Sequence, residues 1–111
     1  MTTPGLEEAA GRFGGPPPLV TVLKVLRAYQ PQAREIGVEL VGVVGSVARG
    51  EATAESDIDV VYDVVGRPTL FGLGRIMADL EDRLACRIDL VGRRAMKPER
   101  WAWMSRDLVL L

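Results

Sequence analysis

Three short runs rich in β-branched residues constrain the fold of this chain most strongly. They cover residues 38–44, 57–63 and 87–91, and glycine or polar residues bound each of them. Such short apolar runs are typical of buried strands rather than of helices. Segments with helical spacing alternate with them along the chain. We therefore expect an α/β fold in which helices flank a small sheet.

Apolar residues at helical spacing predict three helices around these strands. The first covers residues 19–28 and continues, after a break at Pro31, to about residue 36. The second covers residues 69–84, with its charged residues on the solvent side. The last has a proline in its first turn. This helix begins near Pro98, contains Trp101 and Met104, and extends at most to Leu108.

The length of 111 residues fits one domain with its own core. Residues 1–18 are rich in glycine and proline, so we expect a flexible tail followed by a domain over residues 19–111. The N-terminus lacks the basic start and apolar run of a signal peptide, and no segment approaches the ~20 apolar residues of a membrane span. These features predict a cytoplasmic protein that does not bind membranes.

Composition excludes several classes of chemistry. The chain has no histidine, which rules out Ser-His-Asp catalysis and histidine-ligated metals. Its single cysteine, Cys86, rules out a disulfide scaffold and a multi-cysteine zinc site. The formal net charge of -1 gives no sign of bulk electrostatic attraction to nucleic acid. Catalysis by carboxylates and hard metal ions is still permitted.

Three aspartates stand within the predicted strands. Asp57 and Asp59 are two residues apart, which places both on one face of a strand, and Asp89 stands in the third strand. If these strands are neighbours, the three carboxylates converge, and a divalent cation with all-oxygen ligands, Mg²⁺ or Mn²⁺, would make the cluster tolerable. The alternative is that these aspartates cap turns at strand ends and face water.

A glycine-bounded turn directly follows the first predicted strand. Gly45 and Ser46 begin this turn and Gly50 closes it. Backbone N–H groups and the Ser46 hydroxyl are suited there to binding phosphate oxygens. Arg49 either neutralises phosphate charge or forms a surface ion pair with Glu51 or Glu55. A phosphate cradle one strand away from a carboxylate pair would supply both halves of a metal–triphosphate site.

Two further groups of residues have interpretations outside this site. Tyr62 and Asp63 fit the end of a strand better than the site. A basic run near the C-terminus is either a solvated face or a contact for an acidic partner or a nucleotide. It consists of Arg93, Arg94, Lys97 and Arg100.

Together these motifs resemble the signature of the nucleotidyltransferase superfamily that includes DNA polymerase β. The segment 45–50 is similar to its Gly-Ser motif, 56–60 to its Asp-x-Asp strand, and 87–91 to its third-carboxylate strand. The stand-alone minimal nucleotidyltransferases of this superfamily are similar in size, and the resemblance covers about residues 19–111. Residues 98–111 resemble the C-terminal helix of that family only loosely. The resemblance implies a small mixed sheet flanked by helices.

The resemblance also implies a role for each matching residue. Gly45 and Ser46 would hold the β and γ phosphates of ATP, and Asp57 and Asp59 would bind two Mg²⁺ ions, with Mn²⁺ as the alternative. Asp89 would complete the shell of the catalytic ion near the acceptor hydroxyl, either as general base or only as a ligand. In-line attack on the α-phosphate would then release pyrophosphate.

The minimal subgroup implies a protein partner, because the chain ends before a helical acceptor-binding domain could form. The resemblance to that subgroup implies an antitoxin, which transfers AMP from ATP to a tyrosine hydroxyl of a HEPN ribonuclease toxin. A hetero-oligomer is then expected, without direct binding of nucleic acid.

Two alternatives stay open for the function. One is a small-molecule nucleotidyltransferase of the aminoglycoside-resistance type, acting as a dimer. The other is an antitoxin that acts by binding alone, although a pure binder has no evident need for three convergent carboxylates.

Overall fold

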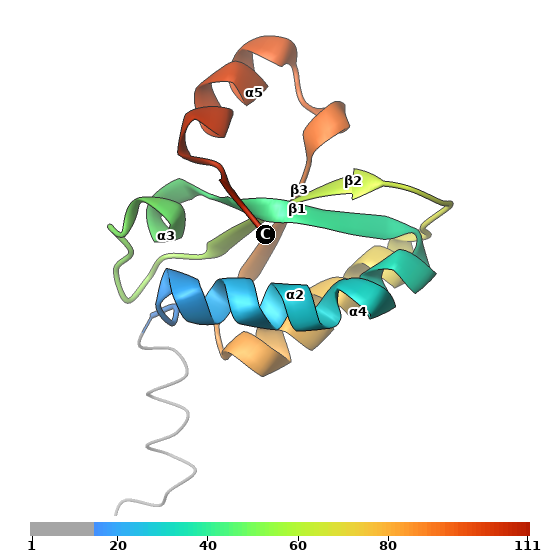
Figure 1. Cartoon of the computed structure of the whole chain (residues 1–111), viewed down its shortest axis with the longest axis horizontal. Helices are drawn as coiled ribbons and strands as arrows, with labels where there is room; N and C mark the ends of the chain where they lie inside the picture. The colour runs from blue at the N-terminus through green and yellow to red at the C-terminus, as the bar shows by residue number, and fades with distance from the viewer. Residues whose placement is uncertain (1–14) are drawn as a thin grey trace, which may run out of the picture.

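The computed structural model describes residues 15–111 (Figure 1). Most of the predicted flexible tail, residues 1–14, therefore lies outside the described residues. Residues 15–18 belong to no helix or strand and lead directly into the first described helix. The predicted boundary between tail and domain stays a prediction.

A mixed sheet of four strands forms the centre of the fold, in the order β3-β2-β1-β4. β1 (Val38–Val44) pairs antiparallel with β2 (Ile58–Val64), and β2 pairs parallel with β3 (Ile88–Gly92). The short β4 (Val109–Leu110) pairs antiparallel with β1 on the other side. The three longer strands match the predicted runs to within one residue, and the small mixed sheet is confirmed.

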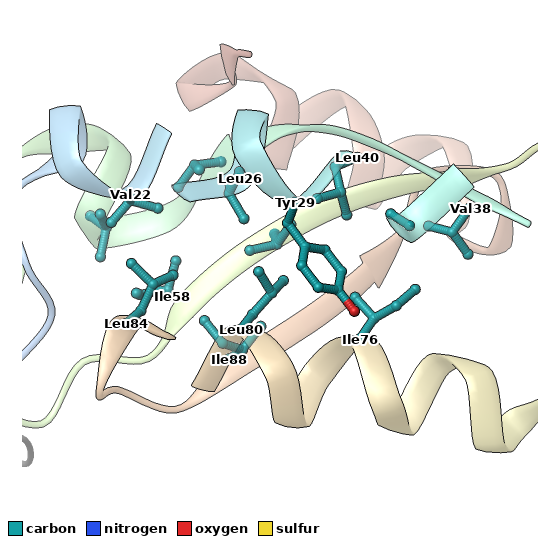
Figure 2. Close-up of a cluster of buried hydrophobic side chains, with 14 residues drawn as sticks. Val22, Leu26, Tyr29, Val38, Leu40, Ile58, Ile76, Leu80, Leu84 and Ile88 are labelled. Carbon is teal, nitrogen blue, oxygen red and sulfur yellow. The ribbon is translucent and has the colours of Figure 1, made fainter. Parts of the chain in front are cut away.

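Two helices cover one face of this sheet, α2 (Leu19–Ile36) and α4 (Leu70–Leu84) (Figure 1). Each buries a stripe of residues at helical spacing against β-branched side chains of the strands. Tyr29 lies between the two helices, and its hydroxyl donates a hydrogen bond to Asp79 Oδ2 at 2.6 Å (Figure 2). Buried side chains of this cluster include Val22, Leu26, Ala33, Leu40, Ile58, Ile76, Leu80 and Ile88.

The opposite face of the sheet carries a smaller apolar cluster. Val44, Val61 and Val91 form it, and partly buried residues of the C-terminal segment pack on them, including Trp101 and Met104. This segment contains the 3₁₀ turns η1 (Arg93–Ala95) and η2 (Ser105–Asp107) with the helix α5 (Pro98–Met104) between them. In Figure 1 it forms an arch on the side of the sheet opposite α2 and α4. We call residues 93–107 the C-terminal arch.

The predicted break at Pro31 is wrong, because α2 is one continuous helix through that residue. Proline removes one backbone hydrogen bond, but Pro31 is exposed, so water can bind the carbonyl that loses its donor. Tyr29 and Ala33 are buried on either side of it. Their packing on the sheet outweighs the local preference of proline for a helix end.

The predicted C-terminal end of the chain is also wrong. α5 ends at Met104, Leu108 has extended backbone, and Val109 and Leu110 form a strand instead of continuing a helix. The amide of Leu111 donates to the carbonyl of Val41 at 3.1 Å, which fixes the end of the chain on β1. A strand of two residues has too little periodicity to be seen in a sequence.

Within residues 15–111, none of the helices combines the length and the apolar character that crossing a bilayer requires.

Gly42 allows β4 to approach β1, which generates a stability prediction. A Cβ atom at residue 42 would lie 2.2 Å from the Val109 carbonyl oxygen, so Gly42→Ala should displace β4 and lower the free energy of unfolding by about 1–3 kcal/mol. Urea denaturation measures the loss, and faster hydrogen exchange at the Leu111 amide locates it.

Gly74→Ala is the matched control, because nothing lies within 4 Å of a Cβ at that helical position. This variant should be more stable than the wild type by about 0.5–1 kcal/mol. Unchanged exchange at Leu111 in Gly42→Ala would contradict this account of β4.

Candidate active site

Asp59 and Asp89 stand side by side on neighbouring strands. They are register partners in the parallel pair of β2 and β3, and such strands lie about 4.8 Å apart. Asp59 shares its face of β2 with Val61, which belongs to the smaller apolar cluster. Both carboxylates therefore lie on the face that carries the C-terminal arch, opposite α2 and α4. The sequence predicts that these carboxylates converge if their strands are neighbours, and β2 and β3 are neighbours in the sheet.

The environment of Asp59 opposes its negative charge. Burial, then the charges of Asp89 and Asp57, raise the pKa of Asp59 from 3.8 to about 6, although Arg49 acts in the opposite direction. Neighbouring like charges and desolvation both favour the protonated form of a carboxyl group. A cation bound at Asp59 would reverse this balance.

Gly45 lies directly against the carboxylate of Asp59. Its φ of +81° is left-handed, and a Cβ at residue 45 would lie 2.3 Å from Asp59 Oδ2. Glycine is therefore required here both by backbone conformation and by space. Ser46 follows it at the start of α3 (Gly45–Arg49), so the predicted phosphate cradle and the predicted carboxylate meet at the junction of β1 and α3.

Asp57 precedes β2 and is held differently. Its Oδ1 lies 3.3 Å from the Nε of Arg87, and both side chains are substantially exposed. Asp57 is close enough to affect the charge of Asp59, but residues 15–111 contain no group of three acidic, cysteine or histidine side chains already arranged around a metal position. The structure thus brings Asp59 and Asp89 together and pairs Asp57 with Arg87.

The residues present fit a hard divalent cation by their chemistry. All candidate ligands are carboxylate oxygens. Burial first, and then the neighbouring carboxylates, raise the pKa of Asp59, and a bound cation would stabilise its charged form. Gly45 keeps the space beside Asp59 Oδ2 free of a side chain. The assignment of metal to Asp57, Asp59 and Asp89 stays a prediction.

Arg49 forms surface ion pairs. Its Nε lies 2.9 Å from Glu51 and its Nη1 lies 3.0 Å from Asp107. Hydrogen bonds to both carboxylates raise the pKa of Arg49 above its ordinary value. The pairing with Glu51 was one of the predicted options; Asp107, 58 residues away, could not be found from local sequence. The role of Arg49 toward phosphate stays a prediction.

Sequence reasoning missed an ion pair between Asp63 and Arg93. Arg93 donates from Nε to Oδ1 of Asp63 at 3.1 Å and from Nη2 to the other carboxylate oxygen. The Arg93 guanidinium also lies 6.0 Å from the centre of the Trp101 ring. This bidentate pair ties the start of the C-terminal arch to β2. In the sequence, Asp63 fits the end of a strand and Arg93 belongs to a basic run, but the two are 30 residues apart and no local pattern joins them.

Comparison with known proteins assigns the family. A family model described as "Nucleotidyltransferase domain" matches residues 21–107. The chain belongs to the nucleotidyltransferase family. It is a nucleotidyltransferase enzyme, and members of this family generally use a nucleoside triphosphate and divalent metal ions.

Individual relatives agree with this family. "Protein adenylyltransferase MntA" of Thermococcus cleftensis is 36% identical over 92 residues, which are 82% of this chain and 93% of the relative. "Putative protein adenylyltransferase MJ0126" of Methanocaldococcus jannaschii is 29% identical over 79 residues, 70% of this chain and 81% of the relative. A solved chain named "Structure of putative minimal nucleotidyltransferase" matches with a TM-score of 0.73 and 32% identity, over 86% of this chain and 97% of that chain. The predicted family and fold are confirmed.

Gly45 and Gly50 offer a matched test of the cradle, since both have left-handed φ. Gly45→Ala places a methyl group against Asp59, whereas a Cβ at Gly50 meets nothing within 4 Å. Both variants should lose about 1–2 kcal/mol of stability through backbone strain, and Gly45→Ala should lose more because its methyl group meets Asp59 Oδ2. Only Gly45→Ala should weaken binding of a fluorescent ATP analogue with Mg²⁺, by about tenfold or more. Equal affinities in the two variants would contradict the cradle.

Asp59→Asn tests the electrostatics of the site. In the metal-free wild type the unfolded chain ionises Asp59 near its ordinary pKa and the folded chain only near 6, so folding stability falls as pH rises between these values. Asp59→Asn should therefore be more stable than the wild type at pH 8, by about 1–2 kcal/mol after solvent screening of a half-buried group, and equal to it below about pH 4.

Urea denaturation without metal at several pH values measures this difference. Glu55→Gln, at an exposed carboxylate in the preceding loop, keeps Asp59, so its difference in stability from the wild type should not change with pH in this way. A wild type that is the more stable protein at pH 8 would contradict the assigned electrostatics.

Proposed function

We propose that this nucleotidyltransferase is a Mg²⁺-dependent protein adenylyltransferase, an antitoxin that transfers AMP from ATP to a tyrosine hydroxyl of a HEPN ribonuclease toxin. The observation that carries the proposal is the contact of Gly45 with Asp59 next to Asp89, where phosphate and acceptor would meet. The relatives named protein adenylyltransferase support protein as the acceptor. Such a pair would act in the cytoplasm.

On this proposal, the nucleotide phosphates and the acceptor hydroxyl would bind on opposite sides of Asp59. Gly45 and Ser46, after β1, would bind and orient the β and γ phosphates through backbone N–H groups and the hydroxyl. Asp89, on the neighbouring strand β3, would lie near the acceptor hydroxyl. It would either accept the proton of that hydroxyl or act only as a metal ligand. Asp57 would have to leave Arg87 to join them.

Bound Mg²⁺ would supply charge neutralisation of the triphosphate and a lower pKa for the acceptor hydroxyl. The tyrosine oxygen would form a bond to the α-phosphorus as the bond from that phosphorus to the bridging oxygen breaks. Pyrophosphate would leave with the electron pair, and the hydroxyl proton would pass to a base. An AMP group on a ribonuclease would oppose RNA by charge and by size.

Purification of the tagged protein from its native host, followed by intact-mass analysis of partners, tests the proposal. A helical partner should gain the mass of one or more AMP units after Mg-ATP is added. Asp57→Ala should still bind this partner but should lower transfer by at least about 100-fold, because a ligand made in the transition state is lost. Glu55→Ala, an exposed residue two positions earlier, should transfer as the wild type does.

Other outcomes separate the alternatives. A partner that binds tightly but never gains mass would contradict transfer and favour an antitoxin that acts by binding. The absence of any partner, with transfer of AMP to an aminoglycoside, would favour the small-molecule enzyme.

A further inference from the structure

We propose that the recess beside Asp89 is the acceptor-binding surface and that Lys97 and Arg100 at its rim select an acidic polypeptide segment. This inference rests on the proposed function, because it takes the acceptor to be a protein. The inference adds that the segment around the acceptor hydroxyl is acidic and that Lys97 and Arg100 recognise this segment.

The recess joins the candidate site to the C-terminal arch. It has a volume of about 520 Å³ and extends from Asp89 along the end of β3 to η1 and α5. Val91, Ala95 and Met96 give it an apolar wall, and Lys97 and Arg100 line it from the arch. In Figure 1 the arch rises from the end of β3. The residues that line the recess come from β3 and from the arch. A polypeptide segment placed there would lie beside Asp89.

The order of the strands puts this recess on the acceptor side of the reaction. Gly45 follows β1, Asp59 is on β2, and Asp89 is on β3, in that order across the sheet. The phosphate cradle and the recess therefore lie on opposite sides of Asp59. The nucleotide phosphates would occupy the side of Gly45, which leaves Lys97 and Arg100 for the group that attacks.

Charge at the rim of the recess points to an acidic partner. Lys97 and Arg100 are exposed, and within the part of the chain that the structure describes neither forms an ion pair. Arg93, in the same basic run, is instead engaged by Asp63. Two unpaired cations next to an apolar wall fit acidic side chains that flank an aromatic residue.

The rim is held in place before any partner binds. The bidentate pair of Arg93 with Asp63 and the contact of Arg93 with Trp101 connect η1 and α5 to β2. Trp101 and Met96 also pack on the smaller apolar cluster. Because these contacts fix the arch on the sheet, Lys97 and Arg100 are positioned relative to Asp89, and little ordering is required when a partner binds.

Peptide binding measured without ATP tests the selection separately from catalysis. The probes are fluorescein-labelled peptides in which a tyrosine is flanked by glutamates, by glutamines or by lysines, and the readout is fluorescence anisotropy. The wild type should bind the glutamate peptide about tenfold more tightly than the glutamine peptide. K97E/R100E should lose this preference and gain one for the lysine peptide, an inversion that a merely structural role would not produce.

Arg94→Glu is the matched control, because Arg94 belongs to the same basic run but does not line the recess. It should keep most of the preference for glutamate, and an equal loss would overturn the proposal in favour of diffuse attraction. Affinity for a fluorescent ATP analogue provides a second readout. If K97E/R100E weakens binding of this analogue and leaves the peptides unaffected, the recess belongs to the nucleotide and the proposal is wrong. Selective peptide binding without AMP transfer to any protein would support the recess and contradict the proposed function.

Discussion

The crowding of carboxylates at the start of β2 is the constraint on which the rest of the structure depends. Asp59 is half-buried against Gly45 and next to Asp89, an arrangement that raises its pKa to about 6 and opposes folding at neutral pH. The opposite face of the same strands compensates, because Ile58 and Ile88 are buried beneath α2 and α4. Apolar packing on one face thus fixes the register that brings two carboxylates together on the other.

The face that carries the site is assembled from segments far apart in the sequence. Asp63 and Arg93 tie the C-terminal arch to β2, and Gly42 allows the last strand to approach β1. Arg49, on the helix that begins with the cradle, pairs with Asp107 at the end of the arch. These contacts connect β2 and α3 to the C-terminal arch and leave Asp89 and the recess beside it open. The larger apolar cluster therefore lies on one face of the sheet, and the carboxylates lie on the other face beside the smaller apolar cluster.

Much of this architecture could be predicted from the sequence, because its signals are local. β-branched runs gave the three longer strands, and the Gly-Ser turn followed by Asp-x-Asp indicated the family. The remainder depends on tertiary contacts. Pro31 is tolerated within α2 because it is exposed between buried neighbours, β4 is only two residues long, and the partners of Asp63 and Arg49 are remote in sequence. Local periodicity contains no information on such contacts.

The central claim is that Asp59 and Asp89 bind a divalent cation together with a nucleotide. Electron paramagnetic resonance of Mn²⁺, titrated in the presence of a non-hydrolysable ATP analogue, tests it most directly. Wild type and Glu55→Gln, a change at an exposed residue in the loop before β2, should bind Mn²⁺ with similar affinity, whereas Asp59→Asn and Asp89→Asn should bind it at least about tenfold more weakly. Wild-type affinity in both folded site variants would contradict the claim.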